Sequence, residues 1–354
     1  GDGTRKRLVR GADRRTVETV LIPMPRGGAA GDAYVDDDGD AGAAEPSDSR
    51  DERGDSRDAR GDSRDERGDS SHERGDPGAE RDDHGGWARS SGVAPTPFTQ
   101  CISSQVGCAM GCVFCASGIA GLKRHLTAGE IVAQVLLGRR EVPADAHLRN
   151  VVFMGMGEPL ANYDAVARAL VLLTHPDGLG LSKRRVTVST SGLVPEIDRL
   201  GRDFGGQVQL AVSLHAPDDA RRSEIMPINR KYPLRELLGA LERYPLPKRR
   251  RITIEYTLIR GFNAAPADAA ALARVLRRIP VKVNLIPMNA IEGNPLEAPS
   301  WDDVDTFQAA LRDHGVFAFV RRRKGDDIAA ACGQLALRGE AKKTRVALPM
   351  ISGR

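Results

Sequence analysis

The chain has 354 residues, 40% of them hydrophobic, which is enough for the core of one large domain or two ordinary ones. It contains no run of 18 apolar residues, and its N-terminal segment GDGTRKRLVRGADRR has no apolar stretch, so we expect neither a membrane span nor a secretory signal. The net charge of +4 conceals a division, because residues 31–86 carry 20 Asp and Glu against 8 Lys and Arg, and the rest of the chain is correspondingly basic. A basic body indicates a polyanionic partner such as nucleic acid, although charge alone fits a merely basic protein equally well.

A β-hairpin is expected over residues 4–23, in a first segment that we bound at 1–25. Thr4–Arg10 and Thr16–Ile22 read as strands, Gly11–Asp13 reads as the turn between them, and Pro23 ends the second strand. On this pattern alone Glu18, between Val17 and Thr19, is an exposed strand carboxylate.

Residues 26–96 differ from the rest of the chain in composition. Ala, Gly, Asp and Pro dominate, and a seven-residue repeat close to SRDERGD runs from Ser49 to Asp76. A period of seven is typical of coiled coils, but the repeat offers no apolar seam. With a Gly in every repeat and mixed charges throughout, it cannot bury enough surface to offset its ordering entropy, so we expect a disordered acidic insertion.

From residue 97 to 335 the pattern alternates between strands and helices. Seven apolar runs predict strands: Phe98–Val106, Asn150–Met154, Arg185–Ser189, Val208–Leu214, Arg251–Leu258, Val281–Ile286 and Val316–Val320. Segments of helical period lie between them: Thr127–Arg140, Tyr163–Thr174, Pro233–Arg243, Ala265–Arg278 and Trp301–His314. Near-continuous apolar strands alternating with helices indicate an α/β fold, a parallel sheet closed into a partial (β/α)6-type barrel.

Polar motifs follow the strands of this expected barrel. They are Gly155-Met156-Gly157-Glu158-Pro159, Ser189-Thr190-Ser191-Gly192, Ser213-Leu214-His215 and Pro287-Met288-Asn289. Each is weak alone, since a Gly-rich turn is usually only a turn and a lone histidine is usually structural. Active sites of such barrels lie at the carboxyl ends of the strands, so their common position predicts one shared site.

Three thiols follow the first strand, in Cys108-Ala-Met-Gly-Cys112-Val-Phe-Cys115. Thiolates select zinc, copper or iron–sulfur clusters. A structural zinc site normally closes with four ligands, and no fourth Cys or His stands at a short offset here, since His125 is ten residues further on. The spacing therefore favours a four-iron cluster with one iron open to another molecule.

Two further cysteines complete the set. Cys332 lies in a loop of small residues after the cationic run Arg321–Lys324, which suits an accessible nucleophile, although a buried helical cysteine is the alternative. Cys101 faces the same choice. Five cysteines, an odd number with three of them clustered, indicate thiols used for chemistry in a reducing compartment, and we expect a cytoplasmic protein. Residues 336–354 form a basic C-terminal tail.

These motifs together resemble the RlmN/Cfr family of radical S-adenosylmethionine (SAM) RNA methyltransferases, the RlmN branch more than the Cfr branch. The matching segments are the CxxxCxxC loop, CISSQVGC at 101–108, GMGEPL at 155–160, LSKRRVTVSTSG at 181–192, SLHAP at 213–217, NLIPMN at 284–289 and GDDIAAACGQL at 325–335. The resemblance covers residues 4–23 and about 98–345. It implies the radical SAM fold, with residues 97–335 as the catalytic core and the hairpin as the remnant of an accessory domain.

The resemblance also implies a role for each site residue. Cys108, Cys112 and Cys115 would hold a [4Fe–4S] cluster whose open iron chelates the amino and carboxylate groups of SAM. The cofactor contacts would be Gly157, Glu158, Ser189, Ser213, Leu214, His215 and Asn289. Cys332 would carry a methyl group as S-methylcysteine, Cys101 would resolve the protein–RNA adduct through a disulfide with Cys332, and Glu18 would be the proton acceptor.

The implied reaction is methylation of adenine C2 in 23S rRNA and tRNA. Abstraction of a hydrogen atom from the methyl group on Cys332 would leave a carbon radical, which adds to C2. Polar methyl transfer fails at this carbon because it is not nucleophilic. The implied protein is a monomer supplied with electrons by a donor such as flavodoxin or ferredoxin, with no membrane partner. Three alternatives stay open: methylation at C8 as in the Cfr branch, a radical SAM enzyme with a non-RNA substrate, and a non-catalytic zinc and RNA-binding module.

Overall fold

The computed structural model describes residues 2–24, 95–321 and 330–335. The acidic insertion, all of the cationic run except Arg321, and the basic tail lie outside the described residues, so the expectations for them stay predictions. None of the helices in the described ranges is long and apolar enough to cross a membrane.

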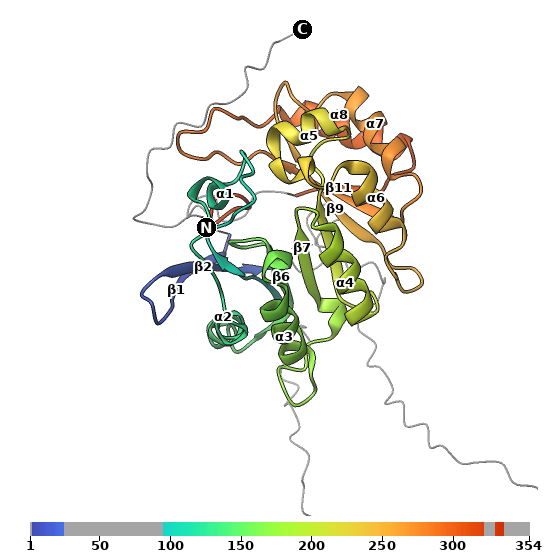
Figure 1. Ribbon diagram of the computed structural model, residues 1–354. Helices are drawn as coiled ribbons and strands as arrows, with labels where there is room; N and C mark the ends of the chain where they lie inside the picture. The colour runs from blue at the N-terminus through green and yellow to red at the C-terminus, as the bar shows by residue number, and fades with distance from the viewer. Residues whose placement is uncertain (1, 25–94, 322–329, 336–354) are drawn as a thin grey trace, which may run out of the picture. The chain divides into compact units, whose positions relative to one another are not determined.

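One nine-stranded sheet carries the fold, in the order β1-β2-β3-β6-β7-β8-β9-β10-β11 (Figure 1). Its strands are β1 Arg5–Arg10, β2 Thr16–Pro23, β3 Thr96–Cys101, β6 Ala146–Phe153, β7 Val186–Thr190, β8 Gln209–Ser213, β9 Ile252–Leu258, β10 Val281–Pro287 and β11 Ala318–Val320. From β3 to β11 every neighbouring pair is parallel, which confirms the expected α/β barrel-type sheet. A small second sheet pairs β4 Gln105–Val106 with β5 Arg124–His125.

Helices alternate with these strands along the chain. They are α1 Ala116–Ala120, α2 Ala128–Glu141, α3 Tyr163–Thr174, α4 Val194–Phe204, α5 Asp219–Ile225, α6 Leu234–Glu242, α7 Pro266–Leu276 and α8 Trp301–Asp313. Figure 1 shows α2, α3, α4 and α6 following one another along the sheet. The expected capping box opens α2, where Thr127 Oγ1 accepts from the backbone N–H of Glu130 (3.2 Å).

The structure differs from expectation in three helices and two strands. α1, α4, α5 and the two-residue strand β5 were not expected, and the run Phe98–Val106 is not one strand but β3 and β4 with a break between them. At the break, residues 102–104 contact the loop at 155–157. The Gly155 N–H donates to the Ile102 carbonyl (3.0 Å) and the Ser104 N–H donates to the Met156 carbonyl (2.9 Å).

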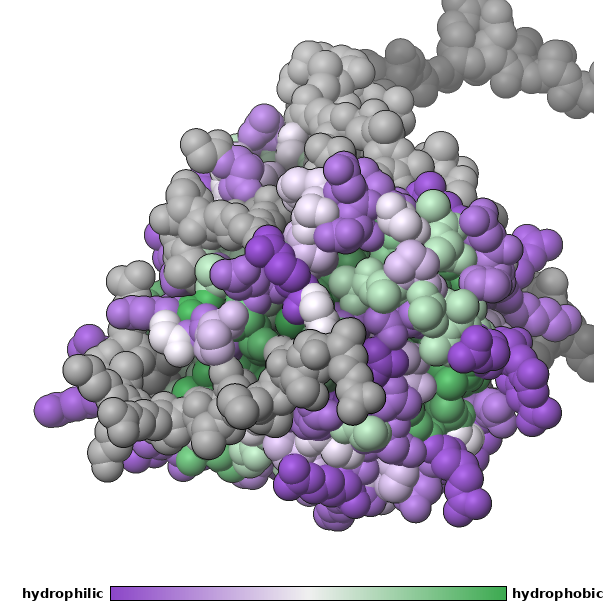
Figure 2. Space-filling model, turned by 90° about the horizontal axis from the view of Figure 1, so that it is seen from above, coloured by the Kyte–Doolittle hydropathy of each residue, from purple (hydrophilic) through white to green (hydrophobic). Residues whose placement is uncertain are grey.

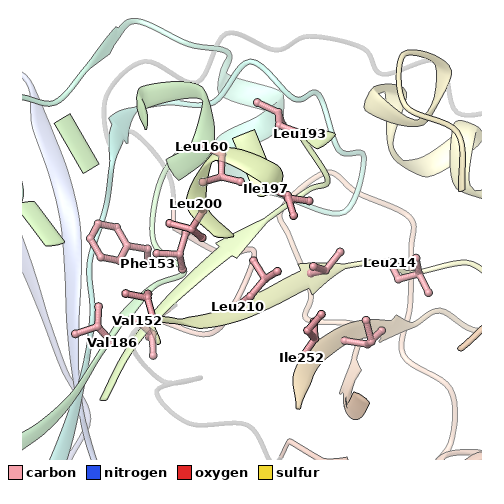
Figure 3. Packing of buried hydrophobic residues seen from close by; sticks show 14 of the residues in the cluster. Val152, Phe153, Leu160, Val186, Leu193, Ile197, Leu200, Leu210, Leu214 and Ile252 are labelled. Atoms are coloured by element: carbon pink, nitrogen blue, oxygen red, sulfur yellow. The ribbon is translucent and has the colours of Figure 1, made fainter. Parts of the chain in front are cut away.

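The helices bury their apolar faces against the sheet. Ile197 and Leu200 of α4 are fully buried, and Figure 3 shows them close to the strands that carry Val186 and Leu210. Burying each such side chain contributes about 1.5–3 kcal/mol. Seen from above, the coloured surface is mainly hydrophilic, and hydrophobic surface appears in patches between the hydrophilic residues (Figure 2).

The N-terminal hairpin is present and extends the parallel sheet. β1 pairs antiparallel with β2, and β2 pairs antiparallel with β3, with Val20 opposite Cys101. Glu18 is only 2% exposed, so its interpretation as an exposed strand carboxylate is wrong. Its strand, β2, lies between β1 and β3 in the sheet and is not an edge strand. The sequence of the hairpin alone cannot indicate this position.

Candidate active site

A cavity of about 160 Å³ lies where the parallel strands end. Its walls contain the three clustered thiols, the loop after β6, the ends of β7 and β8, and residues of β9, β10 and the loop after β11. The predicted residues that line it are Cys108, Cys112, Cys115, Gly157, Glu158, Ser189, Ser213, His215, Asn289 and Cys332. Most of the predicted site therefore converges on one place, as the rule for barrel strand ends requires.

The cysteine loop needs glycines to adopt its path. Gly107 and Gly111 have φ of 77° and 67°, which side chains of L-residues rarely tolerate. A Cβ on Gly107 would collide with the carbonyl of Gly121. The loop then runs directly into α1, with the Cys115 N–H bonded to the Cys112 carbonyl (3.2 Å), which directs the thiols to one wall.

Burial makes these thiols poor acids in the absence of a metal. It raises the pKa of Cys108 to about 12 and that of Cys112 well above its usual value, and the nearby Cys115 thiol and Glu158 carboxylate raise both further. Metal coordination deprotonates a thiol outright, so the cost of burying thiolate falls when positively charged iron is present. The environment thus fits a metal-loaded loop better than three free thiolates.

Cys332 is fixed to the same wall by backbone contacts. The N–H of Ala116 donates to the Gly333 carbonyl (2.8 Å), and Ser117 Oγ donates to the Leu335 carbonyl (2.6 Å). Asn289 Nδ2 donates to the carbonyl of Cys332 itself (2.8 Å). The residue lies in a turn and is partly exposed, so the alternative of a buried helical cysteine is wrong.

Cys101 and Glu18 lie on the inner face of the sheet, although neither lines the cavity. Side chains alternate along a strand, and Gln100 points outward, where its amide donates to the Gln134 carbonyl of α2 (2.6 Å). Cys101 therefore points inward, and Glu18, two residues before its partner Val20, shares that face. Glu18 forms a buried ion pair with Lys6 (3.3 Å).

The Cys101 thiol lies near Cys332. Burial, and secondarily the Cys332 thiol, raise the pKa of Cys101 to about 12. All five cysteines are free in the structure, so the Cys101–Cys332 disulfide is implied by the family resemblance only.

Glu158 organises the ends of β6 and β7. Its Oε1 accepts from the Leu160 N–H (3.0 Å) and its Oε2 accepts from the Ser191 N–H (2.7 Å). Desolvation raises the pKa of this carboxyl, while these bonds oppose the rise. An ionised carboxylate in the cavity wall is suited to receive a cationic group of a ligand.

His215 is a neutral imidazole that presents Nε2 as a donor. Its Nδ1 accepts from the Thr257 N–H (2.9 Å), which places the proton of the neutral ring on Nε2. Burial lowers the pKa of His215 to about 3. The ring packs edge-on against Phe114 of the cysteine loop. Leu214, its neighbour, is fully buried in the hydrophobic core instead, so only its backbone could reach a cofactor.

Acid should weaken the fold through His215. The unfolded chain binds a proton near pH 6.5 whereas the folded chain resists it until about pH 3, so this contribution is complete above pH 6.5 and is lost as the pH falls. His215→Asn keeps an acceptor for Thr257 and removes the titrating ring. Between pH 6 and 4 the free energy of unfolding of the wild type should fall by about 1.4 kcal/mol per pH unit more than that of the variant, measured by urea unfolding. Parallel pH profiles would contradict this.

Gly157 should not tolerate a side chain. Its φ is 103°, and a Cβ would lie 2.5 Å from Cβ of Gln105. Gly157→Ala should therefore destabilise the protein by about 2–5 kcal/mol, the sum of backbone strain and overpacking. Gly261→Ala is the matched control, since Gly261 has a φ of 70° and open space around it, and should cost about 1–2 kcal/mol. Equal losses in thermal unfolding would show that the close approach to Gln105 is unimportant.

Two important residues were not predicted from the sequence. Arg222 of α5 is fully buried and bonds the carbonyls of Ser191, Ser213 and Leu214 at the ends of β7 and β8. Glu255 of β9 is 4% exposed and lines the cavity. A charged residue inside the apolar run Arg251–Leu258 was the available signal for Glu255, whereas nothing in the sequence distinguishes Arg222 from its neighbour Arg221.

The cavity has polar atoms that fit a bound cofactor. Among the described residues, Ser191 Oγ, Glu255 Oε1 and Asn289 Oδ1 are buried and have no hydrogen-bond partner, and all three residues line the cavity. Buried polar atoms are normally satisfied, so these three indicate a ligand that supplies hydrogen-bonding groups. No three His, Cys, Asp or Glu side chains of the described ranges are placed to hold a single metal ion. The fit is to a polar organic ligand beside a wall of thiols.

Comparison with known families defines the class. The family model of the Radical SAM superfamily matches residues 102–273, which contain the cysteine loop and the strands from β6 to β9. A solved structure titled as a radical SAM methyltransferase from Sphaerobacter thermophilus superposes with a TM-score of 0.71 at 40% identity, covering 94% of this chain and 77% of that one. The fold is that of a radical SAM enzyme, a class that uses SAM and a [4Fe–4S] cluster.

Comparison with individual proteins narrows the class. "Dual-specificity RNA methyltransferase RlmN" of Sorangium cellulosum is 56% identical over 348 residues, covering 98% of this chain and 80% of the relative. The protein of the same name from Geobacter sulfurreducens is 55% identical over 245 residues, covering 69% of this chain and 66% of the relative. The chain belongs to the RlmN family of radical SAM methyltransferases, which confirms the resemblance drawn from its motifs.

Proposed function

We propose that this protein methylates C2 of adenine in RNA, with 23S rRNA and tRNA as substrates. The printed name of its relatives supports RNA as the substrate class. The observation that carries the proposal is the position of Cys332, which the bonds from Ala116 and Asn289 hold at the cavity beside the cysteine loop. A thiol in that position is suited to receive a methyl group and to present it to a radical.

When bound, the cluster and SAM supply the one-electron chemistry, with Cys108, Cys112 and Cys115 as the cluster ligands. The chain's own residues would do the rest. The Cys332 sulfur would accept a methyl group and carry it to adenine. Glu18, held by Lys6 on the inner face, would take the proton that leaves C2, and Cys101 would free the product by forming a disulfide with Cys332. Glu158, Ser213, His215 and Asn289 would orient the cofactor.

The expected partners follow from this chemistry. An electron donor such as flavodoxin or ferredoxin would reduce the cluster. A reducing compartment would keep the five thiols free, so we place the protein in the cytoplasm. We expect it to act as a monomer. Residues 97–335 would form the catalytic unit, to which the hairpin contributes Glu18.

Mass spectrometry of RNA tests the proposal directly. Nucleosides of 23S rRNA and tRNA should contain 2-methyladenosine in cells that carry the gene, lose it when the gene is deleted, and regain it with the wild-type gene but not with a Cys112→Ser variant. Appearance of 8-methyladenosine would assign the protein to C8 chemistry. Unchanged RNA in both strains would sink the proposal.

A further inference from the structure

The carboxylate of Glu255 has one satisfied oxygen and one unsatisfied oxygen. Oε2 accepts a hydrogen bond from Nδ2 of Asn284 on the neighbouring strand β10 (2.8 Å), which fixes the orientation of the carboxylate. Oε1 is buried and has no partner among the described residues. Desolvation raises the pKa of Glu255, and Arg321, Asn284 and Lys282 oppose the rise. A buried, oriented oxygen without a hydrogen-bond partner at the wall of a cavity is suited to accept a hydrogen bond from a ligand donor.

The position of Glu255 limits which ligand group it can meet. It lies opposite Ser213 of β8 in the sheet register, and β6, β7 and β8 separate it from β3, whose end leads into the cysteine loop. The other carboxylate in the cavity wall nearest the thiols is Glu158, which lies close enough to Cys108 and Cys112 to raise the pKa of both. The two carboxylates therefore serve different parts of an elongated ligand.

SAM offers three kinds of hydrogen-bond donor: one ammonium, two ribose hydroxyls and the adenine amino group. The α-amino and carboxylate groups are its metal-chelating end, which belongs beside the thiols and Glu158. Glu255 then faces the nucleoside half. A carboxylate is the acceptor that proteins commonly direct at ribose hydroxyls.

We propose that Glu255 Oε1 accepts a hydrogen bond from a ribose hydroxyl of SAM, with Asn284 as the positioning residue that orients the carboxylate. The inference rests on SAM as the cofactor but not on the RNA position that is methylated. It makes Glu255 a cofactor-binding residue in addition to those predicted from the motifs.

Calorimetric binding to the anaerobically reconstituted holoprotein tests this contact. The probes are S-adenosylhomocysteine, which is not consumed, and its 2′-deoxy and 3′-deoxy analogues. One deoxy analogue should bind the wild type about 10- to 100-fold more weakly than the parent compound, as expected for a hydrogen bond to a charged acceptor. Glu255→Ala should weaken the parent to a similar extent and show no further loss with that analogue. Glu242→Ala, at an exposed position of α6, should bind all three probes like the wild type.

The test compares the loss of affinity caused by a deoxy analogue in the wild type with the loss that it causes in Glu255→Ala. A difference between the two losses, which we call coupling, distinguishes a direct contact from a structural role. If both deoxy analogues lose the same factor in the wild type and in Glu255→Ala, the ribose contact does not exist and the inference is overturned. Glu255→Gln guards against misfolding of the alanine variant. Without nucleotide it should unfold at the same temperature as the wild type or higher, because it removes an unpaired buried carboxylate oxygen. A lower unfolding temperature with unchanged affinity would make Glu255 purely structural.

The outcome is independent of the RNA product. Coupling at Glu255 together with an RNA product other than 2-methyladenosine would overturn the proposed function and leave this inference standing. Formation of 2-methyladenosine without coupling would do the reverse.

Discussion

Cys332→Ala should abolish RNA methylation, with a loss of at least about 10³-fold, the scale seen when a covalent nucleophile is removed. The proposed reaction has no second route, since the methyl group must pass through this sulfur. The substitution should leave the site otherwise intact. Asn289 holds residue 332 by its backbone carbonyl, and Ala116 holds Gly333 by its carbonyl, so neither bond needs the thiol.

The measurement is methyl transfer to unmodified rRNA fragments by the anaerobically reconstituted enzyme, with iron and sulfide content measured in parallel. Cys101→Ala is the matched control, because it removes the neighbouring thiol from the same inner face. It should still methylate Cys332, detectable by peptide mass, and should accumulate a covalent protein–RNA adduct. If Cys332→Ala turns over at the wild-type rate, the methyl group is not carried on Cys332 and the enzyme belongs to another radical SAM class.

Arg222→Met should cause the largest loss of stability, about 3–5 kcal/mol in the free energy of unfolding. The guanidinium is fully buried and donates to the Ser191 carbonyl (2.7 Å), the Ser213 carbonyl (3.1 Å), the Leu214 carbonyl (3.1 Å) and Asn229 Oδ1 (2.8 Å). Methionine fills a similar volume but removes the donor to the Ser191 and Ser213 carbonyls and to Asn229 Oδ1, whereas the Leu214 carbonyl keeps the Ala216 N–H (2.8 Å). Each buried acceptor left unsatisfied costs about 1–3 kcal/mol. Desolvation lowers the pKa of Arg222 to about 10, so it stays charged at neutral pH.

Arg221→Met is the control at the adjacent position. Arg221 is partly exposed and pairs with the half-exposed Asp218 and the mostly buried Asp268, so its loss should cost about 1–2 kcal/mol, less than that of the fully buried Arg222. Urea unfolding of the cofactor-free variants distinguishes the two. Arg222→Lys should not restore stability, because an ammonium cannot reproduce the forked geometry of four bonds. A loss at Arg222 no greater than that at Arg221 would show that the strand ends hold together without it.

Much of the fold was predictable because its strands are buried on both faces and follow one another along the chain. The predicted strand Asn150–Met154 is apolar from Val151 onward, and residues 151–153 are buried, so its pattern is unambiguous. α4 was missed because Pro195 in its first turn resembles a helix breaker, although proline is well suited to that position. α5 was missed because a seven-residue helix with four charged residues offers too short an apolar face to show a period.

The site was predictable where a motif ends a strand and unpredictable where tertiary packing decides. The rule for strand ends brought Glu158, Ser189, Ser213, His215 and Asn289 together without any structure. The burial of Glu18 depends on a register in which β2 lies between β1 and β3, and the burial of Arg222 depends on three carbonyls from two strands. Both conditions depend on contacts between segments that are distant in the chain, so the local sequence does not predict them.

The hydrogen bonds between the start of α1 and the C-terminal loop can form only late in synthesis of the chain. Ser117 and its partner Leu335 are 218 residues apart, which a ribosome needs roughly 10–40 s to translate. During that interval the cluster thiols have left the ribosome while the segment that will cover them does not yet exist. Any cofactor that the loop takes up during synthesis therefore meets it before residues 330–335 have folded against α1.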